Sequence, residues 1–184
     1  MLAASFDTRA SRALRTSGQC IEPCGLKIKS LLGNGITIDL LKNCPQHIPS
    51  LIQIAREGLG PTWSPTEEQL RLSLHSDSLP LTVVALDKGT PVGMCSLCKS
   101  KSLRLDLSPW LGPLVVDKQY QKCGIGNQLI EAVKQKARML GVKKLYLCTH
   151  DPDLATKYYQ SRGWTTVGVD EWKGHAVTVM ETNL

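Results

Sequence analysis

The segment Trp110–Asn127 restricts the fold of this chain more than any other. Its apolar first part, Trp110–Val116, predicts a strand that is buried on both faces. A polar loop with Gly124 and Gly126 follows, and apolar residues then repeat at helical spacing as far as Leu140. A loop of this kind presents free backbone N–H groups at a helix N-terminus, where they bind phosphate. The same spacing also suits an ordinary strand–helix turn in which the glycines only allow close packing.

The other apolar patterns predict a single α/β domain. Strands are expected at 36–40, 81–86, 92–98, 110–116, 144–149, 164–169 and 176–181, and helices at 46–58, 64–75, 124–140 and 152–162. In the second helix, Ser64 is the expected cap and Glu67 its partner in a capping box. This order predicts a mixed central sheet of about seven strands flanked by about four helices. The strands on either side of the third helix must be parallel, joined by a right-handed crossover.

Residues 1–34 differ in composition from the rest and are read as an extension, with residues 35–184 as the domain. The extension contains Arg9, Arg12 and Arg15, several serines and few acids, which is typical of an organelle transit peptide. A disordered extension explains the same composition. A secretory signal is not expected, because no apolar run of about ten residues follows the start.

Composition excludes several classes of protein. Hydrophobic residues make up 42% and charged residues 21%, as in a globular protein, and no apolar run is long enough to cross a membrane. The net charge is +6, half of it in residues 1–34, and there is one Phe, so nucleic-acid binding is not expected. Seven cysteines without framework spacing indicate free thiols and a cytoplasmic location. Cys95 and Cys98 have half of a zinc-site spacing but no second pair, so no metal site is expected.

Two motifs give the chain a family resemblance. The loop reads Gln121-Lys-Cys-Gly124-Ile-Gly126, which lacks the Lys-Ser/Thr of a Walker A loop and the third glycine of a dinucleotide fingerprint. The later helix contains Ala155-Thr-Lys-Tyr-Tyr-Gln-Ser-Arg-Gly163-Trp. Together these motifs resemble the GCN5-related N-acetyltransferase (GNAT) superfamily over about residues 36–183. The resemblance implies a GNAT-like fold and acetyl-CoA as cosubstrate.

The resemblance also implies which residues hold the coenzyme. In the family, the strand before the loop contacts the pantetheine arm and the loop amides hold the pyrophosphate. The corresponding residues here are Leu114, Val115, Val116, Gln121, Lys122, Cys123, Gly124, Ile125, Gly126 and Asn127. Two positions depart from the family pattern. Gln121 replaces the commoner Arg, with Lys122 beside it, and Pro152 stands where an Asn often contacts the coenzyme.

The resemblance makes Tyr159 the expected general acid, with a hydrogen-bonded core tyrosine as the alternative. A phenol beside the thioester sulfur can donate a proton as thiolate charge develops. Tyr158 points about 100° away on the same helix and is expected in the core. His150, at the end of the preceding strand, is the expected base, because an ordinary imidazole pKa near 6.5 suits proton removal. Asp151 would either orient its ring or cap the next helix; Glu57 and Asp106 are weaker candidates.

The sequence therefore predicts an N-acetyltransferase that transfers acetyl from acetyl-CoA directly to a primary amine of a small molecule or peptide. The first two helices, their loop 59–64 and the final hairpin are expected to select the acceptor. Trp63, Trp110 and Trp172 are candidates for lining its cleft. A non-catalytic coenzyme A-binding regulatory module is the alternative, since it would need the glycines but neither Tyr159 nor a base. A homodimer stays open.

Overall fold

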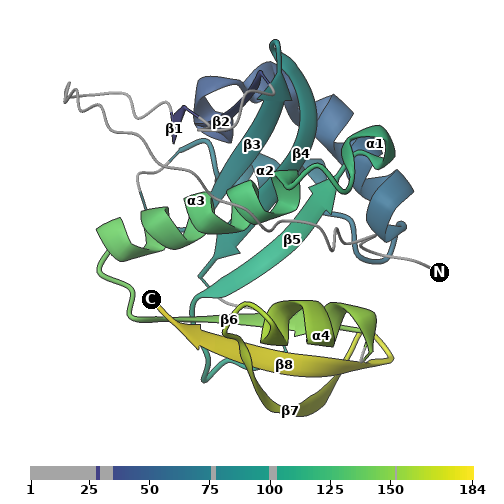
Figure 1. Ribbon diagram of the computed structural model, residues 1–184, viewed down its shortest axis with the longest axis vertical. Helices are drawn as coiled ribbons and strands as arrows, with labels where there is room; N and C mark the ends of the chain where they lie inside the picture. The colour runs from purple at the N-terminus through teal and green to yellow at the C-terminus, as the bar shows by residue number, and fades with distance from the viewer. Residues whose placement is uncertain (1–27, 30–34, 76–77, 100–102, 152) are drawn as a thin grey trace.

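The computed structural model describes residues 28–29, 35–75, 78–99, 103–151 and 153–184, which form one mixed sheet with helices on both faces (Figure 1). The strands are β1 (Ile28–Lys29), β2 (Ile36–Leu40), β3 (Leu81–Asp87), β4 (Thr90–Cys98), β5 (Trp110–Val116), β6 (Lys144–Thr149), β7 (Thr165–Trp172) and β8 (His175–Asn183). The α-helices are α1 (Ile48–Leu59), α2 (Glu67–Leu72), α3 (Ile125–Met139) and α4 (Leu154–Gln160). Short 3-10 turns precede α1 and α3.

The strand order is β1-β2-β3-β4-β5-β6-β8-β7. All neighbours are antiparallel except β5 and β6, which flank α3 as the predicted parallel pair. Among the described residues, a single pair, Trp110 with Tyr146, joins β5 to β6, whereas six pairs join β6 to β8. The two strands therefore separate beyond this pair, and the sheet divides into a β1–β5 part and a β6–β8–β7 part (Figure 1).

Alternation along the strands gives the sheet two apolar faces, because successive side chains point to opposite sides. Val83 and Cys95 belong to the core that α3 and α4 cover. Val84 and Met94 belong to the core that α1 and α2 cover. The helices on the two faces thus bury both sides of β3 and β4, as an uninterrupted apolar run requires.

Local sequence signals account for most element boundaries. Lys88 and Gly89 both have positive φ and close a two-residue hairpin between β3 and β4. Opposite Cys95 and Ser96, the register skips Pro113, which cannot donate a ladder hydrogen bond and occupies a bulge in β5. Strands 36–40, 110–116 and 144–149 match their predicted bounds.

Two expectations about element ends need correction. Thr66, not Ser64, caps α2, in a reciprocal capping box with Gln69. The Ser64 hydroxyl instead donates to the carbonyl of Gly60.

Pro152 and nearly all of the 1–34 extension lie outside the described residues, but Ile28–Lys29 pairs with β2 and extends the sheet. None of the helices in the described ranges is long and apolar enough to span a membrane.

Candidate active site

The loop from β5 to α3 turns sharply just before the helix. Asp117 accepts a hydrogen bond from the backbone N–H of Gln119 and begins a 3-10 turn. Lys122 and Gly124 then adopt positive φ values of 64° and 78°. Gly124 is the N-cap of α3, and nothing lies within 4 Å of the position that its Cβ would occupy. The start of a 15-residue helix is therefore uncovered, and its N–H groups and dipole favour an anion there.

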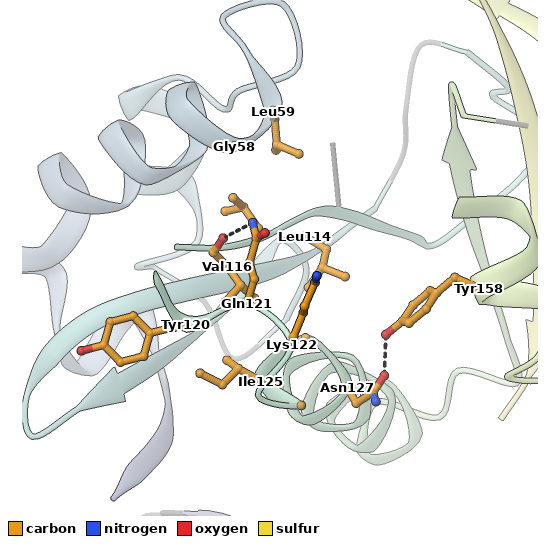
Figure 2. A pocket seen from close by; sticks show the side chains of 13 residues that line it. Gly58, Leu59, Leu114, Val116, Tyr120, Gln121, Lys122, Ile125, Asn127 and Tyr158 are labelled. Atoms are coloured by element: carbon orange, nitrogen blue, oxygen red, sulfur yellow. Dashed lines mark hydrogen bonds between the residues drawn. The ribbon is translucent and has the colours of Figure 1, made fainter. Parts of the chain in front are cut away.

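A pocket lies between this loop, β5 and the end of α1 (Figure 2). It is lined by nine of the ten residues expected to hold the coenzyme, which are Leu114, Val115, Val116, Gln121, Lys122, Gly124, Ile125, Gly126 and Asn127. Cys123 does not line it; this residue is exposed, and its thiol lies 3.5 Å from the carbonyl oxygen of Gln121. Gly58 and Leu59 complete the pocket from α1.

Gln121 and Lys122 have different roles in this pocket. The side-chain amide of Gln121 donates to the carbonyl oxygen of Val116 at 3.1 Å, so it folds back onto β5 (Figure 2). Lys122 carries the positive charge among the residues that line the pocket. The charge lost by having Gln121 in place of an arginine is therefore restored one residue later.

Tyr158 lines this pocket and packs against the edge of the core, whereas the sequence-based expectation placed it inside the core. Its hydroxyl donates to Oδ1 of Asn127, as Figure 2 shows. The guanidinium of Arg162 stacks 3.6 Å from the centre of the Tyr158 ring and donates through Nε to the same Asn127 oxygen. Burial raises the pKa of Tyr158, while Arg162 acts in the opposite direction. These contacts fix the side chain of Asn127 beside the helix start.

A larger cavity of about 680 Å³ adjoins this pocket, and both are lined by Leu59 and Leu114. Tyr159 lines its wall and is 8% exposed, within the core cluster that α3 and α4 cover. Burial raises the pKa of the Tyr159 phenol, with the neighbouring thiols of Cys95 and Cys148 contributing. The phenol therefore keeps its proton at neutral pH, which a general acid requires.

Aromatic rings gather at the mouth of this cavity. The rings of Trp63 and His150 stack with their centres 5.0 Å apart and their planes within 5°. Trp172 and His175, from the β7–β8 hairpin, lie 5.2 and 5.4 Å from Trp63. Lys173, at the tip of that hairpin, donates to the carbonyl oxygen of Thr62 at 2.5 Å. The loop after α1 is thus joined to the hairpin across the opening of the sheet.

Of the three tryptophans proposed for the acceptor cleft, Trp63 and Trp172 line the cavity. Trp110 does not, because it is fully buried and its indole N–H donates to the carbonyl of Leu107. His175 is exposed on the same hairpin and takes part in the ring cluster through Trp63.

The candidate bases differ in their surroundings. His150 is exposed and lines the cavity. Asp151 accepts the backbone N–H groups of Asp153 and Leu154, so this carboxylate caps α4 rather than orienting the imidazole. Glu57 is exposed, pairs with Gln53 and does not line the cavity.

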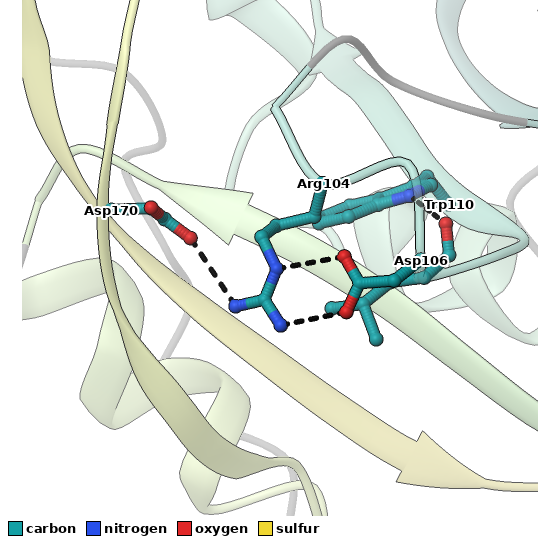
Figure 3. A network of polar contacts seen from close by, with 5 residues as sticks. Arg104, Asp106, Trp110 and Asp170 are labelled. Carbon is teal, nitrogen blue, oxygen red and sulfur yellow. Dashed lines mark hydrogen bonds and ion pairs between the residues drawn. The ribbon is translucent and has the colours of Figure 1, made fainter.

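Asp106, a weaker candidate, is held in a salt-bridge network that occupies both of its carboxylate oxygens. Arg104 binds its carboxylate through Nε and Nη2, at 2.9 and 2.8 Å, and reaches Asp170 on β7 at 3.4 Å (Figure 3). The hydrogen bonds from Arg104 hold the pKa of Asp106 below its ordinary value. The network ties the loop before β5 to the edge strand β7.

A family model matches this arrangement over most of the domain. The model described as the acetyltransferase (GNAT) family covers residues 48–164, from the start of α1 to the end of the tyrosine motif. The chain belongs to this family. As a GNAT protein, it is an acetyl-CoA-dependent N-acetyltransferase with acetyl-CoA as cosubstrate. No curated protein matches the chain in sequence.

Solved structures share the GNAT fold at low sequence identity. Ard1 from Thermoplasma volcanium is 18% identical, with a TM-score of 0.64 over 82% of this chain and 98% of its own. An aminoglycoside 6'-N-acetyltransferase complexed with coenzyme A is 17% identical, with a TM-score of 0.63 over 79% and 96%. N-acetylglutamate synthase from Neisseria gonorrhoeae, complexed with coenzyme A and N-acetyl-glutamate, is 19% identical, with a TM-score of 0.62 over 81% of this chain and 35% of its own.

Sequence reasoning missed several residues of this GNAT site. No motif in the sequence marks Gly58, because it reaches the pocket only through the packing of α1 against Val115. Arg162 lies inside the tyrosine motif, and its spacing from Tyr158, one helical turn, is a signal that the two side chains meet. Lys173 contacts Thr62, 111 residues away, and no local pattern reports such a contact.

Proposed function

We propose that this acetyltransferase transfers the acetyl group directly to a primary amine of a small molecule or peptide. The observation that carries the proposal is the junction of two cavities at Leu59 and Leu114. The pocket at the start of α3 suits the phosphates of the coenzyme, and the larger cavity suits an acceptor. A thioester that extends from the first along β5 reaches the second at this junction.

The separation of β5 from β6 supports binding of the coenzyme arm there. Beyond the pair Trp110–Tyr146, no β6 residue is paired with the facing edge of β5 within the described residues. Backbone groups of Leu114–Val116 on that edge therefore meet a ligand with amides of its own in place of a neighbouring strand. Lys122 and the N–H groups after Gly124 would hold the pyrophosphate.

In the proposed reaction, the amine nitrogen attacks the thioester carbonyl carbon and the C–S bond then breaks. His150, at the cavity mouth, takes the proton that the ammonium must lose before attack. Tyr159 protonates or hydrogen-bonds the departing sulfur. Its buried, protonated phenol lies on the wall that includes Leu114, where the thioester end is expected. Alignment of the two reactants supplies a further large part of the acceleration.

The first test measures binding of acetyl-CoA by calorimetry and then thiol release with a panel of amines. Binding with release on one class of amine supports the proposal. Tight binding without release on any amine supports a regulatory module instead. Competition between ATP and acetyl-CoA for binding distinguishes a nucleotide-binding protein from both the acetyltransferase and the regulatory module.

Adjacent tyrosines provide a matched pair of variants for the acid. Tyr159→Phe should lower kcat by about 10²- to 10⁴-fold and leave coenzyme affinity nearly unchanged. Tyr158→Phe removes the same hydroxyl from the other pocket, where it contacts Asn127, and should weaken coenzyme binding more than it lowers kcat. Equal turnover for Tyr159→Phe and the unsubstituted enzyme would remove Tyr159 from the mechanism.

The base has a separate test, because its protonation controls the rate at low pH. His150→Gln should abolish the acidic limb of the rate–pH profile measured at saturating acetyl-CoA. An unaltered limb would show that another group, or water alone, accepts the proton.

A further inference from the structure

We infer that the acceptor is a small amine that also carries an anionic group, and that Lys99 and Lys173 bind this anion. The inference rests on the proposed function, because it assigns the larger cavity to the acceptor. Both lysines line that cavity, from the end of β4 and from the tip of the β7–β8 hairpin. Among the described residues that line it, the other ionisable side chains, apart from thiols and the phenol of Tyr159, are His150 and Asp151.

Among the described residues that line the cavity, two lysines outnumber one carboxylate, and that carboxylate is held at the start of α4. One oxygen of Asp151 accepts two backbone N–H groups at the start of α4 and is partly neutralised by them. Among the described residues that line the cavity, no other carboxylate is present. Two lysines thus face one capped carboxylate, and an acceptor with a second positive charge meets repulsion there.

Two acidic residues of the lysine-bearing segments, Asp106 and Asp170, are also paired, whereas Glu171, two residues before Lys173, is exposed. Arg104 binds Asp106 in the loop that follows Lys99, and it reaches Asp170 three residues before Lys173 (Figure 3). In the same loop, the hydroxyl of Ser108 donates to the backbone carbonyl of Lys99. These contacts hold the loop while the carboxylates of Asp106 and Asp170 are occupied by Arg104.

The aromatic cluster at the cavity mouth does not provide a site for a cationic acceptor. The ammonium of Lys173 lies 5.0 Å from the ring centre of Trp172 and 6.0 Å from that of Trp63, within cation–π range. A second cation on these rings would therefore lie close to Lys173. An anion instead gains an attractive partner, because the bond to Thr62 uses one of three N–H donors.

The size limit on the acceptor follows from the same cluster. The bond from Lys173 to Thr62 and the stack of Trp63 on His150 join the loop after α1 to the β6–β8–β7 part of the sheet beside the cavity. A small molecule fits in a space of about 680 Å³ below this connection. An acceptor protein would have to open these contacts to reach the junction at Leu114.

The test compares amines that differ only in charge. β-Alanine, propylamine and 1,3-diaminopropane form one set, and 4-(aminomethyl)benzoate, benzylamine and 4-(aminomethyl)benzylamine form another. With acetyl-CoA, kcat/KM is expected to be at least tenfold higher for the carboxylate than for the neutral member of at least one set, and lowest for the diamine. Salt should reduce this preference, since the lysines are exposed. A preference for the neutral amine or the diamine in both sets overturns the inference.

Variants assign the preference to the two lysines. Lys99→Met and Lys173→Met should each bring the carboxylate-to-neutral ratio toward one, and Lys99→Met does so without breaking the bond to Thr62. Lys157→Met is the matched control, because Lys157 lies exposed on α4 and does not line the cavity. An equal loss of preference in all three variants, or in none, overturns the assignment to Lys99 and Lys173.

A binding measurement separates this inference from the proposed reaction. Titration with each amine, followed by tryptophan fluorescence, reports occupation of the cavity through Trp63 and Trp172 whether or not acetyl is transferred. Quenching by the carboxylate members without thiol release would refute the proposed function and support the anion site. Thiol release from neutral amines together with no selective quenching would support the function and refute the anion site.

Discussion

Gly58 provides a sharp test of how closely α1 packs against β5. A Cβ at this position would lie 2.7 Å from Cγ2 of Val115. Carbon atoms in contact are about 3.5–4.0 Å apart, so a Gly58→Ala variant must displace one of the two elements. Val115 is only 4% exposed and has little room to move. The two neighbours of Val115 line the coenzyme pocket, as Gly58 itself does.

Two effects of opposite sign set the size of the change. Alanine within a helix is favoured over glycine by about 0.5–1 kcal/mol. Overpacking in a well-packed core costs about 1–3 kcal/mol. We therefore expect Gly58→Ala to lower the free energy of unfolding by about 0.5–2 kcal/mol. In a chain of this length that corresponds to a Tm lower by roughly 2–6 °C, and we expect weaker coenzyme binding as well.

Gly126→Ala is the matched control, measured on the ligand-free protein by differential scanning calorimetry. Its Cβ would lie 4.0 Å from Cγ2 of Val116, an ordinary contact, and it sits in the first turn of α3. We expect its Tm to stay level or rise. A combined Gly58→Ala/Val115→Ala variant should be less destabilised than the sum of its parts, because the truncated valine removes the clash. A Tm for Gly58→Ala at or above that of the unsubstituted chain would refute the packing argument.

Three further predictions concern titration, reactivity and the acceptor site. Burial raises the folded-state pKa of Tyr159 above its unfolded value near 10, so stability is present in full below pH 10 and falls as pH rises beyond it. The free energy of unfolding, measured with urea, should fall less steeply with rising pH in Tyr159→Phe than in the unsubstituted chain, by up to about 1.4 kcal/mol per pH unit. Parallel curves for the two proteins would contradict this. N-Ethylmaleimide should label the exposed Cys123 before Cys44, because burial and the nearby Asp39 raise the pKa of the Cys44 thiol to about 11. Acetyl-CoA should slow the labelling of Cys123. Mass spectrometry after digestion measures both. Trp63→Ala should raise the acceptor KM about tenfold and spare acetyl-CoA affinity, and weaker coenzyme binding would contradict this.

The sequence predicted those parts of the fold whose signals are local. The strand 110–116 is recognisable because its apolar run is long and a glycine loop follows it. The loop itself was predictable because Gly124 must adopt a positive φ, which other residues rarely do. The cap of α2 was not predictable, because Ser64 and Thr66 stand two residues apart and are both good capping residues. Only the structure shows that Thr66 is paired with Gln69.

Motifs along the chain indicated the candidate site residues, but contacts between distant segments of the chain were not predictable from them. The coenzyme loop and Tyr159 follow from motifs, whereas the side to which Tyr158 turns depends on where α4 lies relative to α3. Its hydroxyl meets Asn127, 31 residues earlier in the chain, and periodicity within α4 carries no information about that helix. The cluster of Trp63 and His150 likewise joins a loop to a strand end in the other part of the sheet.

The single pair between β5 and β6 makes the sheet itself sensitive to occupancy. Within the described residues, the pair Trp110–Tyr146 is the one point at which a ladder fixes the angle between the two strands, so we expect rotation about this pair in the ligand-free protein. A molecule that lies between them contacts both sides and restricts rotation about this pair. Part of the binding free energy of the first ligand is then offset by the conformational entropy that the protein loses, so the affinity measured for that ligand is lower than its contacts alone would give. The second ligand meets a protein that is already ordered, so the two bind with positive cooperativity even without touching.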